Sequence, residues 1–493
     1  MTPRATLFAG CEPEVAAGPD GRILAVGAGA RATAGRSAEV VRLGGRALPG
    51  MIDAHIHLEG LADQNLTLDM TGAASLEDAM ARVESWAARL PEDGWVIGSG
   101  WYNDLWPNPA FPTRSHLDKA GGGRPVYLRR KDGHSAWVSS AALKLAGIET
   151  ATADPPGGVI DRDGRGAPTG ILREIAIHAV LGILPRPEEA DFDSAMRQAL
   201  KALAAMGVTS VHSMDTARGF ASLQRLHSKD RLPVRVTYNL PLADLHHAER
   251  MGVRSGWGDE WLRFWGVKAF LDGSLGSRTA EMLDGSGTAR LLQPDLVEMI
   301  DRCARAELNV CLHAIGDGAV RRALDAIAQR RVAWPKWRPR IEHAQCVNPK
   351  DVPRFARLGV IASMQPIHAV ADRELADQYW PQVAAHSYAW GAFERAGARL
   401  AFGSDAPVES ADPMLGIEAA TVWRRRAKWH PELAISRAKA LRAYTAGAAY
   451  AVGMERDLGS LRLGKLCDIT VVEDGRVTAT IVGGKVSWRR TPR

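Results

Sequence analysis

The chain has 493 residues, 46% of them hydrophobic, and a formal net charge of +6. Its cationic residues are mostly dispersed, which argues against nucleic-acid binding, and no apolar run is long enough to span a membrane. The five cysteines are scattered without a Cys-X-X-Cys pair, and the N-terminus lacks the apolar core of a signal peptide. We therefore expect a cytoplasmic protein that binds neither nucleic acid nor membranes.

Short apolar runs rich in β-formers recur along the chain and end in polar residues. Helical patterns such as FDSAMRQALKALAAM and AVRRALDAIAQRR lie between them. Strands that alternate with helices indicate βαβ units and a parallel sheet, and eight of them predict a (β/α)8 TIM barrel. The eight candidate strands are 47–57, 207–214, 233–240, 264–274, 308–317, 339–345, 359–366 and 399–408.

Three further regions complete the predicted architecture. Residues 49–454 form the barrel, and residues 59–191 are too long for an ordinary βα loop, so we expect an insertion subdomain that covers the active site. Residues 1–48 and 455–493 show short strand patterns with glycine turns. The simplest arrangement joins the two ends into one composite β-sandwich, and two independent β-rich tails are the alternative.

Polar side chains gather at the ends of the predicted barrel strands. His55 and His57 stand two residues apart in DAHIH, so a strand would point both imidazoles to one side. Active sites of such barrels lie at the C-terminal strand ends. The other candidates at these ends are Lys268, His313, His343 and Asp405.

This set suits two divalent metal ions, because neutral imidazole and carboxylate are common ligands. The first ion would take His55, His57 and Asp405, and the second His313 and His343. A lysine buried in an apolar strand should have a lowered pKa, so Lys268 can react with carbon dioxide to give an anionic carbamate that bridges both metals. A metal-bridging hydroxide would then attack the substrate, and Asp405 would move its proton to the leaving group.

Each residue also has a plain structural interpretation. His313 alone is typical of a core histidine, His343 of a strand-end residue, and Asp405 before Ala-Pro of a turn. Lys268 has Asp272 as an alternative ionic partner. Five separate strand ends that carry these residue types together favour the metal site.

At this point the chain resembles the amidohydrolase superfamily, through DAHIH, Lys268, His313, His343 and GSDAP in strand order. The segment LGSLRLGKLCDITVVE is similar to the one that closes the superfamily's small β-domain, with Cys467 where alanine is usual. DGHSAWVSSAAL, GAPTGILRE, VKAFLDGSLGSRTA and MQPIHAVAD resemble the branch that includes N-substituted formamide deformylase-like proteins. This resemblance implies a chemistry and not a substrate.

Five further residues are candidates for substrate contact. His134 and Trp101 lie in the insertion, where loop ordering and core packing are the alternatives. Glu174 is either a helix-face carboxylate or a substitute for the lysine carbamate. Arg278 suits bidentate binding of a substrate carboxylate. His368 would reach the substrate from the loop after the seventh strand, or order that loop.

The sequence favours a hydrolase that cleaves a C–N amide-type bond other than a peptide bond, in an N-formyl, N-acyl or related small molecule. Zinc is the first choice of metal, with manganese, iron or cobalt as alternatives. A deaminase of an amino-heterocycle ranks lower, because no Glu follows His313 closely. A lactone, carbamate or phosphoester hydrolase, or a degenerate binding protein, also remains open. A homodimer is the working hypothesis for assembly.

Overall fold

The structure is a computed structural model that describes residues 4–131, 135–156, 158–230, 232–276, 278–291 and 293–491. The chain divides into two compact units, one made of Met1–Leu61 with Met196–Arg493 and the other of Ala62–Ala195. No helix of the described part combines the length and the apolar character that a bilayer span requires.

An eight-stranded sheet forms the centre of the larger unit, and every strand pair in it is parallel. β6 and β13 are buried along their whole length, as expected for a parallel sheet covered on both faces. All eight expected strands are present, and the predicted (β/α)8 barrel is confirmed. The strands are β6 (Met51–Ile56), β13 (Val208–Ser213), β14 (Arg235–Pro241), β15 (Leu262–Phe270), β16 (Asn309–Ala314), β17 (Arg340–His343), β18 (Ile361–Met364) and β19 (Arg399–Phe402).

The barrel closes where the end of β19 meets β6. The backbone N–H of Asp405 donates to the carbonyl of His55 at 2.7 Å, and that of His57 donates to the carbonyl of Ala406 at 2.8 Å. Gly403 permits this approach, because a Cβ atom there would lie 2.4 Å from the backbone nitrogen of His55. The closure therefore brings the first and last predicted ligand strands together.

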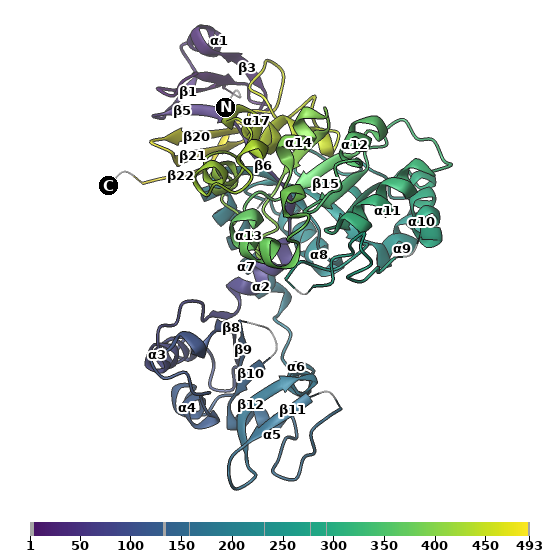
Figure 1. Ribbon diagram of the computed structural model, residues 1–493. Helices are drawn as coiled ribbons and strands as arrows, with labels where there is room; N and C mark the ends of the chain where they lie inside the picture. The colour runs from purple at the N-terminus through teal and green to yellow at the C-terminus, as the bar shows by residue number, and fades with distance from the viewer. Residues whose placement is uncertain are drawn as a thin grey trace. The chain divides into compact units, whose positions relative to one another are not determined.

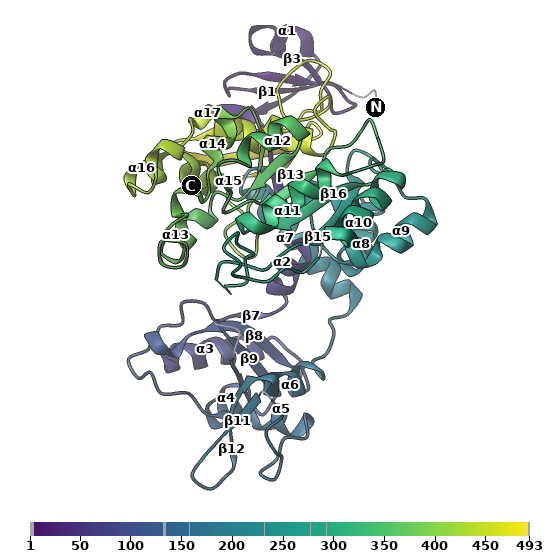
Figure 2. The same cartoon turned by 45° about the vertical axis from the view of Figure 1, so that its right-hand side comes forward.

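Helices alternate with these strands and cover the barrel. In α11, Val320, Leu324 and Ile327 repeat at helical spacing and are buried. Helices α9, α10 and α11 gather on one side of the barrel strands (Figures 1 and 2). The main helices are α7 (Glu189–Ala205), α8 (Ala217–His227), α9 (Leu245–Met251), α10 (Gln293–Arg305), α11 (Asp317–Ala328), α12 (Val352–Leu358), α13 (His368–Tyr379), α14 (Trp390–Arg395), α15 (Pro413–Glu418) and α17 (Arg437–Arg442).

The two chain ends form two further four-stranded sheets in the same unit, and their strands lie side by side in Figure 1. Phe8 and Val15 of one sheet share a hydrophobic cluster with Ile469 and Ile481 of the other, so the composite sandwich is confirmed. Cys467 is buried in this cluster, where its small side chain packs in place of the usual alanine. The strands are β1 (Thr6–Ala9), β2 (Val15–Ala17), β3 (Ile23–Val26) and β4 (Glu39–Arg42), then β5 (Arg46–Pro49), β20 (Ile469–Glu473), β21 (Arg476–Val482) and β22 (Lys485–Arg489).

The smaller unit follows the first barrel strand and has its own six-stranded sheet and helices. Trp101, Trp106 and Trp137 are buried in its core. Its coverage of the active site stays a prediction. Its strands are β7 (Leu68–Asp69), β8 (Val96–Trp101), β9 (Val126–Arg130), β10 (Ser135–Val138), β11 (Gly158–Arg162) and β12 (Pro168–Glu174), with helices α3 (Leu76–Ala87), α4 (Arg114–Ala120), α5 (Ser140–Leu145) and α6 (His178–Leu181).

Candidate metal centre

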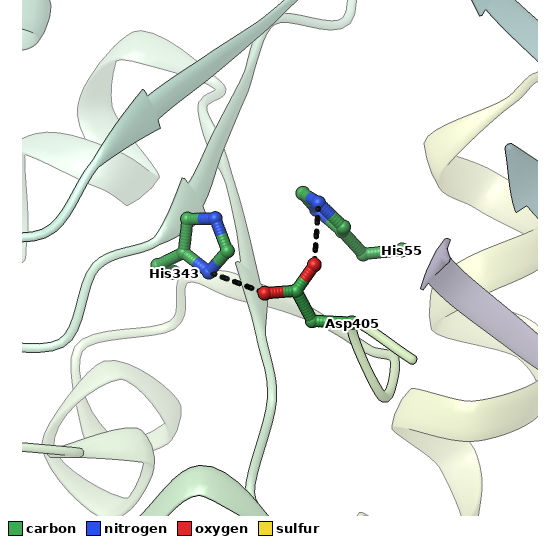
Figure 3. Close-up of side chains that lie close together, drawn as sticks. All are labelled: His55, His343 and Asp405. Carbon is green, nitrogen blue, oxygen red and sulfur yellow. Dashed lines mark ion pairs between the residues drawn. The ribbon is translucent and has the colours of Figure 1, made fainter. Parts of the chain in front are cut away.

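The predicted ligand residues stand at or just beyond the C-terminal ends of five barrel strands. His55 lies in β6, Lys268 in β15, His313 in β16 and His343 in β17, whereas His57 follows β6 and Asp405 follows β19. Donor atoms of His55, His343 and Asp405 lie within 4.8 Å of one another. Figure 3 shows both imidazoles beside the Asp405 carboxylate. The ends of β6, β17 and β19 therefore converge on one cluster.

Left-handed backbone conformations turn two of these residues into the site. His343 has φ 71° and Ala344 φ 43°, and Asp405 has φ 62°. Strand alternation alone would direct Glu342 and His343 to opposite faces. Such φ values are uncommon for residues other than glycine, and they occur here at the ends of two ligand strands.

Asp405 is the centre of the cluster. Its Oδ1 atom lies 3.2 Å from Nε2 of His57 and 3.4 Å from Nε2 of His55, and its Oδ2 atom lies 4.0 Å from Nδ1 of His343. Burial alone would raise the pKa of Asp405, but His55, His57 and His343 hold that pKa well below its usual range. The carboxylate is therefore ionised at neutral pH.

Two imidazoles are oriented by side chains that accept their Nδ1 protons. Nδ1 of His55 lies 2.7 Å from the Glu342 carboxylate, and Nδ1 of His343 lies 2.9 Å from Oε1 of Gln365. The Gln365 amide donates to the Ser363 carbonyl at 3.3 Å, which fixes its own orientation. With the proton on Nδ1, each of these histidines keeps a lone pair on Nε2.

His313 is held in the opposite way. Its Nε2 atom donates to the carbonyl of Gly273 at 2.9 Å, which leaves the Nδ1 lone pair available. Its ring centroid lies 4.4 Å from that of His343. Partners of this kind fix the tautomers of metal-binding histidines and increase their basicity.

The three imidazoles are neutral at physiological pH. Burial and the neighbouring Lys268 lower the pKa of His55 to about 4 and that of His313 to about 3. Burial, with His313 nearby, also lowers the pKa of His343 well below its ordinary value. Neutral imidazole is the form that binds a metal.

Lys268 is buried among these ligands. Its Nζ donates to Nε2 of His55 at 3.0 Å. Burial lowers the pKa of Lys268, against the opposing charges of Glu342 and Asp405. The alternative pairing with Asp272 is not formed, because that carboxylate accepts backbone N–H groups instead, including that of Gly316 at 2.9 Å.

Sequence reasoning missed a buried ionic network behind the ligands. Arg340 binds Glu342 through two hydrogen bonds, of 2.8 and 3.0 Å, and also contacts Nδ1 of His212 at 3.0 Å. Glu342 is 0% exposed and in turn orients His55. The alternating charges of RIEH in a buried strand were the available signal.

Asp53, two residues before His55, ties the barrel seam together. Its Oδ1 atom accepts the backbone N–H groups of His55 and Ser404 at 3.1 and 3.0 Å, and the Ser404 hydroxyl donates to Oδ2 at 2.5 Å. Burial raises the pKa of Asp53 to about 7, although these hydrogen bonds oppose the shift. Asp53 thus positions the two segments that carry the candidate ligands His55 and Asp405.

The five candidates for substrate contact have different settings. Trp101 is 0% exposed in the core of the smaller unit, Glu174 ends β12 with φ 50°, and His134 lies outside the described residues. Arg278 stacks over Tyr379 at 4.3 Å. Their contact with substrate stays a prediction.

His368 differs from those four because it lies in the cluster itself. Its Nε2 atom is 3.7 Å from Oδ2 of Asp405.

The donor set fits divalent metal ions. Three neutral imidazoles with oriented lone pairs, an ionised carboxylate and a buried amine gather where a bare cluster of lone pairs would be unfavourable. Glu342 and the Gly273 carbonyl each accept a ring proton, from His55 and from His313 respectively. The other ring nitrogen of each histidine therefore carries a lone pair.

Comparison with known proteins agrees with this architecture. A model described as the amidohydrolase family matches residues 40–486. Protein LONG AFTER FAR-RED 3 of Arabidopsis thaliana is 33% identical over 509 residues, which cover 94% of this chain and 87% of the plant protein. N-substituted formamide deformylase of Arthrobacter pascens is 26% identical, with 96% and 94% covered.

A solved structure shows the same fold. An uncharacterized metal-dependent hydrolase from Pyrococcus furiosus superposes with a TM-score of 0.77 at 29% identity, and the match covers 96% of this chain and 98% of that one. The resemblance expected from the strand-end residues is therefore confirmed. Because the family model spans nearly the whole chain, this protein belongs to the amidohydrolase family of hydrolases.

Proposed function

We propose that the protein hydrolyses a C–N amide-type bond in a small N-formyl, N-acyl or related molecule, with two divalent metal ions. The convergence of His55, His343 and Asp405, with two lone pairs already oriented, is the observation that carries this proposal. The name of the Arthrobacter pascens relative supports the bond class.

Bound divalent ions supply an acidified water and polarise the substrate carbonyl. Zinc is the first choice, and manganese, iron or cobalt are alternatives because imidazole and carboxylate accept several metals. The residues that would hold one ion are His55, His57 and Asp405, and those for the other are His313 and His343.

Lys268 would complete the site as a carbamate. Burial disfavours its charged form, so more of the amine is neutral and nucleophilic. The amine nitrogen attacks carbon dioxide and loses a proton, and the product carries two anionic oxygens. The carbamate would help to hold the ions, and its negative charge would offset part of their positive charge.

Asp405 would move the proton during hydrolysis. Its ionised carboxylate accepts a proton from the attacking water as the water oxygen bonds to the carbonyl carbon. The proton then passes to the leaving nitrogen as the C–N bond breaks. The products are a carboxylic acid and an amine.

Metal content and a substrate panel test this proposal together. Protein purified without chelators or a metal-affinity column should hold close to two metals per chain by elemental mass spectrometry. It should hydrolyse members of a panel of N-formyl amines and N-acyl amino acids. Turnover confined to lactones or amino-heterocycles would overturn the amide assignment, and at most one metal after incubation with metal and bicarbonate would overturn the carbamate bridge.

A cytoplasmic location and a homodimer are further parts of the proposal. All five cysteines are free and buried, which supports a reducing compartment. Cell fractionation and light scattering test the two statements separately.

A further inference from the structure

His368 has a buried nitrogen for which the described residues provide no hydrogen-bond partner. Its side chain is 8% exposed, and its Nε2 atom is unpartnered. The closest acceptor given for this atom, Oδ2 of Asp405, lies at 3.7 Å, beyond hydrogen-bond distance. Burying a polar group without a hydrogen-bond partner is unfavourable, so the retention of this one calls for an explanation.

The surroundings of His368 place the proton on Nε2. The Gln345 amide nitrogen lies 3.3 Å from Nδ1 and donates to it. An amide nitrogen carries protons and no free lone pair, so Nδ1 accepts and the ring proton lies on Nε2. In the favoured form Nε2–H is a donor, and a protonated nitrogen cannot bind a metal.

The start of α13 carries this donor beside the candidate metal cluster. His368 is the first residue of α13, and its backbone N–H donates to the carbonyl of Gln365 at 3.2 Å. The Gln365 side chain orients His343, and the ring centroids of His343 and His368 lie 6.3 Å apart. One short segment after β18 thus orients an expected ligand and carries the spare donor.

We propose that His368 is a further catalytic residue whose Nε2–H donates a hydrogen bond to the substrate oxygen that gains negative charge during hydrolysis. This inference rests on the proposed amide hydrolysis. A positioned donor that is spare in the resting enzyme stabilises the transition state without reorganisation. His368 keeps its proton throughout, so no bond to it forms or breaks.

Two substitutions separate a donor from other roles. His368→Ala removes the donor and should lower kcat by about 10²–10³-fold with a small change in KM. His368→Gln places an amide N–H near the position of Nε2 and should recover about tenfold or more of the lost kcat. Both variants should keep the wild-type metal content and the shape of the pH–rate profile. His386→Ala, which removes a half-buried histidine outside the cluster, serves as the control and should behave as wild type.

A binding measurement tests hydrogen-bond donation by His368 without turnover. Titration calorimetry on the metal-loaded protein would compare methylphosphonate, a tetrahedral oxyanion, with acetate, a planar one. His368→Ala should weaken methylphosphonate binding at least about fivefold more than acetate binding. A role limited to orienting Asp405 would leave this ratio unchanged and overturn the inference.

The other outcomes are equally decisive. Loss of metal in His368→Ala would make His368 a ligand, and unchanged kcat in an active enzyme would deny it any catalytic role; either overturns the inference alone. Failure of Gln to rescue, with a changed pH profile, would indicate proton transfer instead. A wild-type chain that is inactive on the whole amide panel overturns the proposed function. The effect of His368→Ala on methylphosphonate binding relative to acetate binding then still decides whether Nε2–H is a donor.

Discussion

Glu342→Gln tests whether the buried network prepares the metal site. Glu342 accepts the Nδ1 proton of His55 at 2.7 Å and two hydrogen bonds from Arg340. Burial alone would raise the pKa of Glu342, but Arg340 and His55 hold it well below its usual range, so the carboxylate is ionised. A neutral amide of the same shape removes that charge and places N–H donors beside Arg340 or His55.

Two losses are expected from this change. Removing such a partner of a ligating histidine typically costs 10–100-fold in metal affinity, or about 1.4–2.7 kcal/mol. Breaking a buried ion pair from one side costs about 3–5 kcal/mol of folding stability. The loss of metal affinity is specific to the metal site, whereas the loss of folding stability is expected when any buried ion pair is broken.

Asp468→Asn is the matched control for the second loss. Asp468 is 5% exposed and accepts two hydrogen bonds from the buried Arg235, of 2.8 and 3.1 Å, where the sandwich meets the barrel. Metal affinity would be measured by competition with a chromophoric chelator, and stability by urea unfolding of the metal-free proteins. Both variants should lose stability, but only Glu342→Gln should lose metal affinity. Equal affinities in Glu342→Gln and wild type would refute the positioning role.

Three further outcomes are expected. Lys268→Ala should lose at least one metal per chain by elemental mass spectrometry and most turnover; a full metal content with activity would exclude the carbamate. Asp405→Asn should keep the circular-dichroism spectrum of the wild type but lower kcat by about 10²–10⁴-fold. The control is Asp351→Asn, which changes a buried carboxylate that pairs with Arg321 and should keep near-wild-type turnover. In the metal-free protein, His55 should contribute stability that grows as the pH rises from about 4 to about 6.5, because the unfolded chain binds a proton there that folded His55, with a pKa of about 4, does not. The stability difference between the wild type and His55→Gln should therefore change in favour of the wild type over this range; a difference that does not vary with pH would contradict this assignment.

The barrel was predictable because its signal repeats. Each strand is a short apolar run, and each ligand residue stands where such a run ends, so strand order alone brought His55, His313 and Asp405 to one rim. The composite sandwich followed from the strand patterns of the two ends. Candidate site residues that are marked by a repeated strand pattern and by their place at a strand end can therefore be predicted from a single sequence.

The orienting partners were not predictable in the same way. Alternation places either Glu342 or His343 inside the barrel, and only the left-handed φ of His343 brings both to the site. No glycine or asparagine stands at positions 343 and 344 to indicate this turn in the sequence. Gln365 likewise gains its role only when β18 packs beside β17.

The two kinds of imidazole orientation follow from where each ring finds its acceptor. The acceptors of His55 and His343 are side chains of the barrel strands and of the segment after β18, so these rings present Nε2. His313 finds its acceptor in the backbone of the loop after β15, at Gly273, and presents Nδ1, which lies closer to its own strand. Rings at different strand ends can thus reach a common centre from different depths. The loop after β15 therefore orients one of the candidate ligands through its backbone carbonyl.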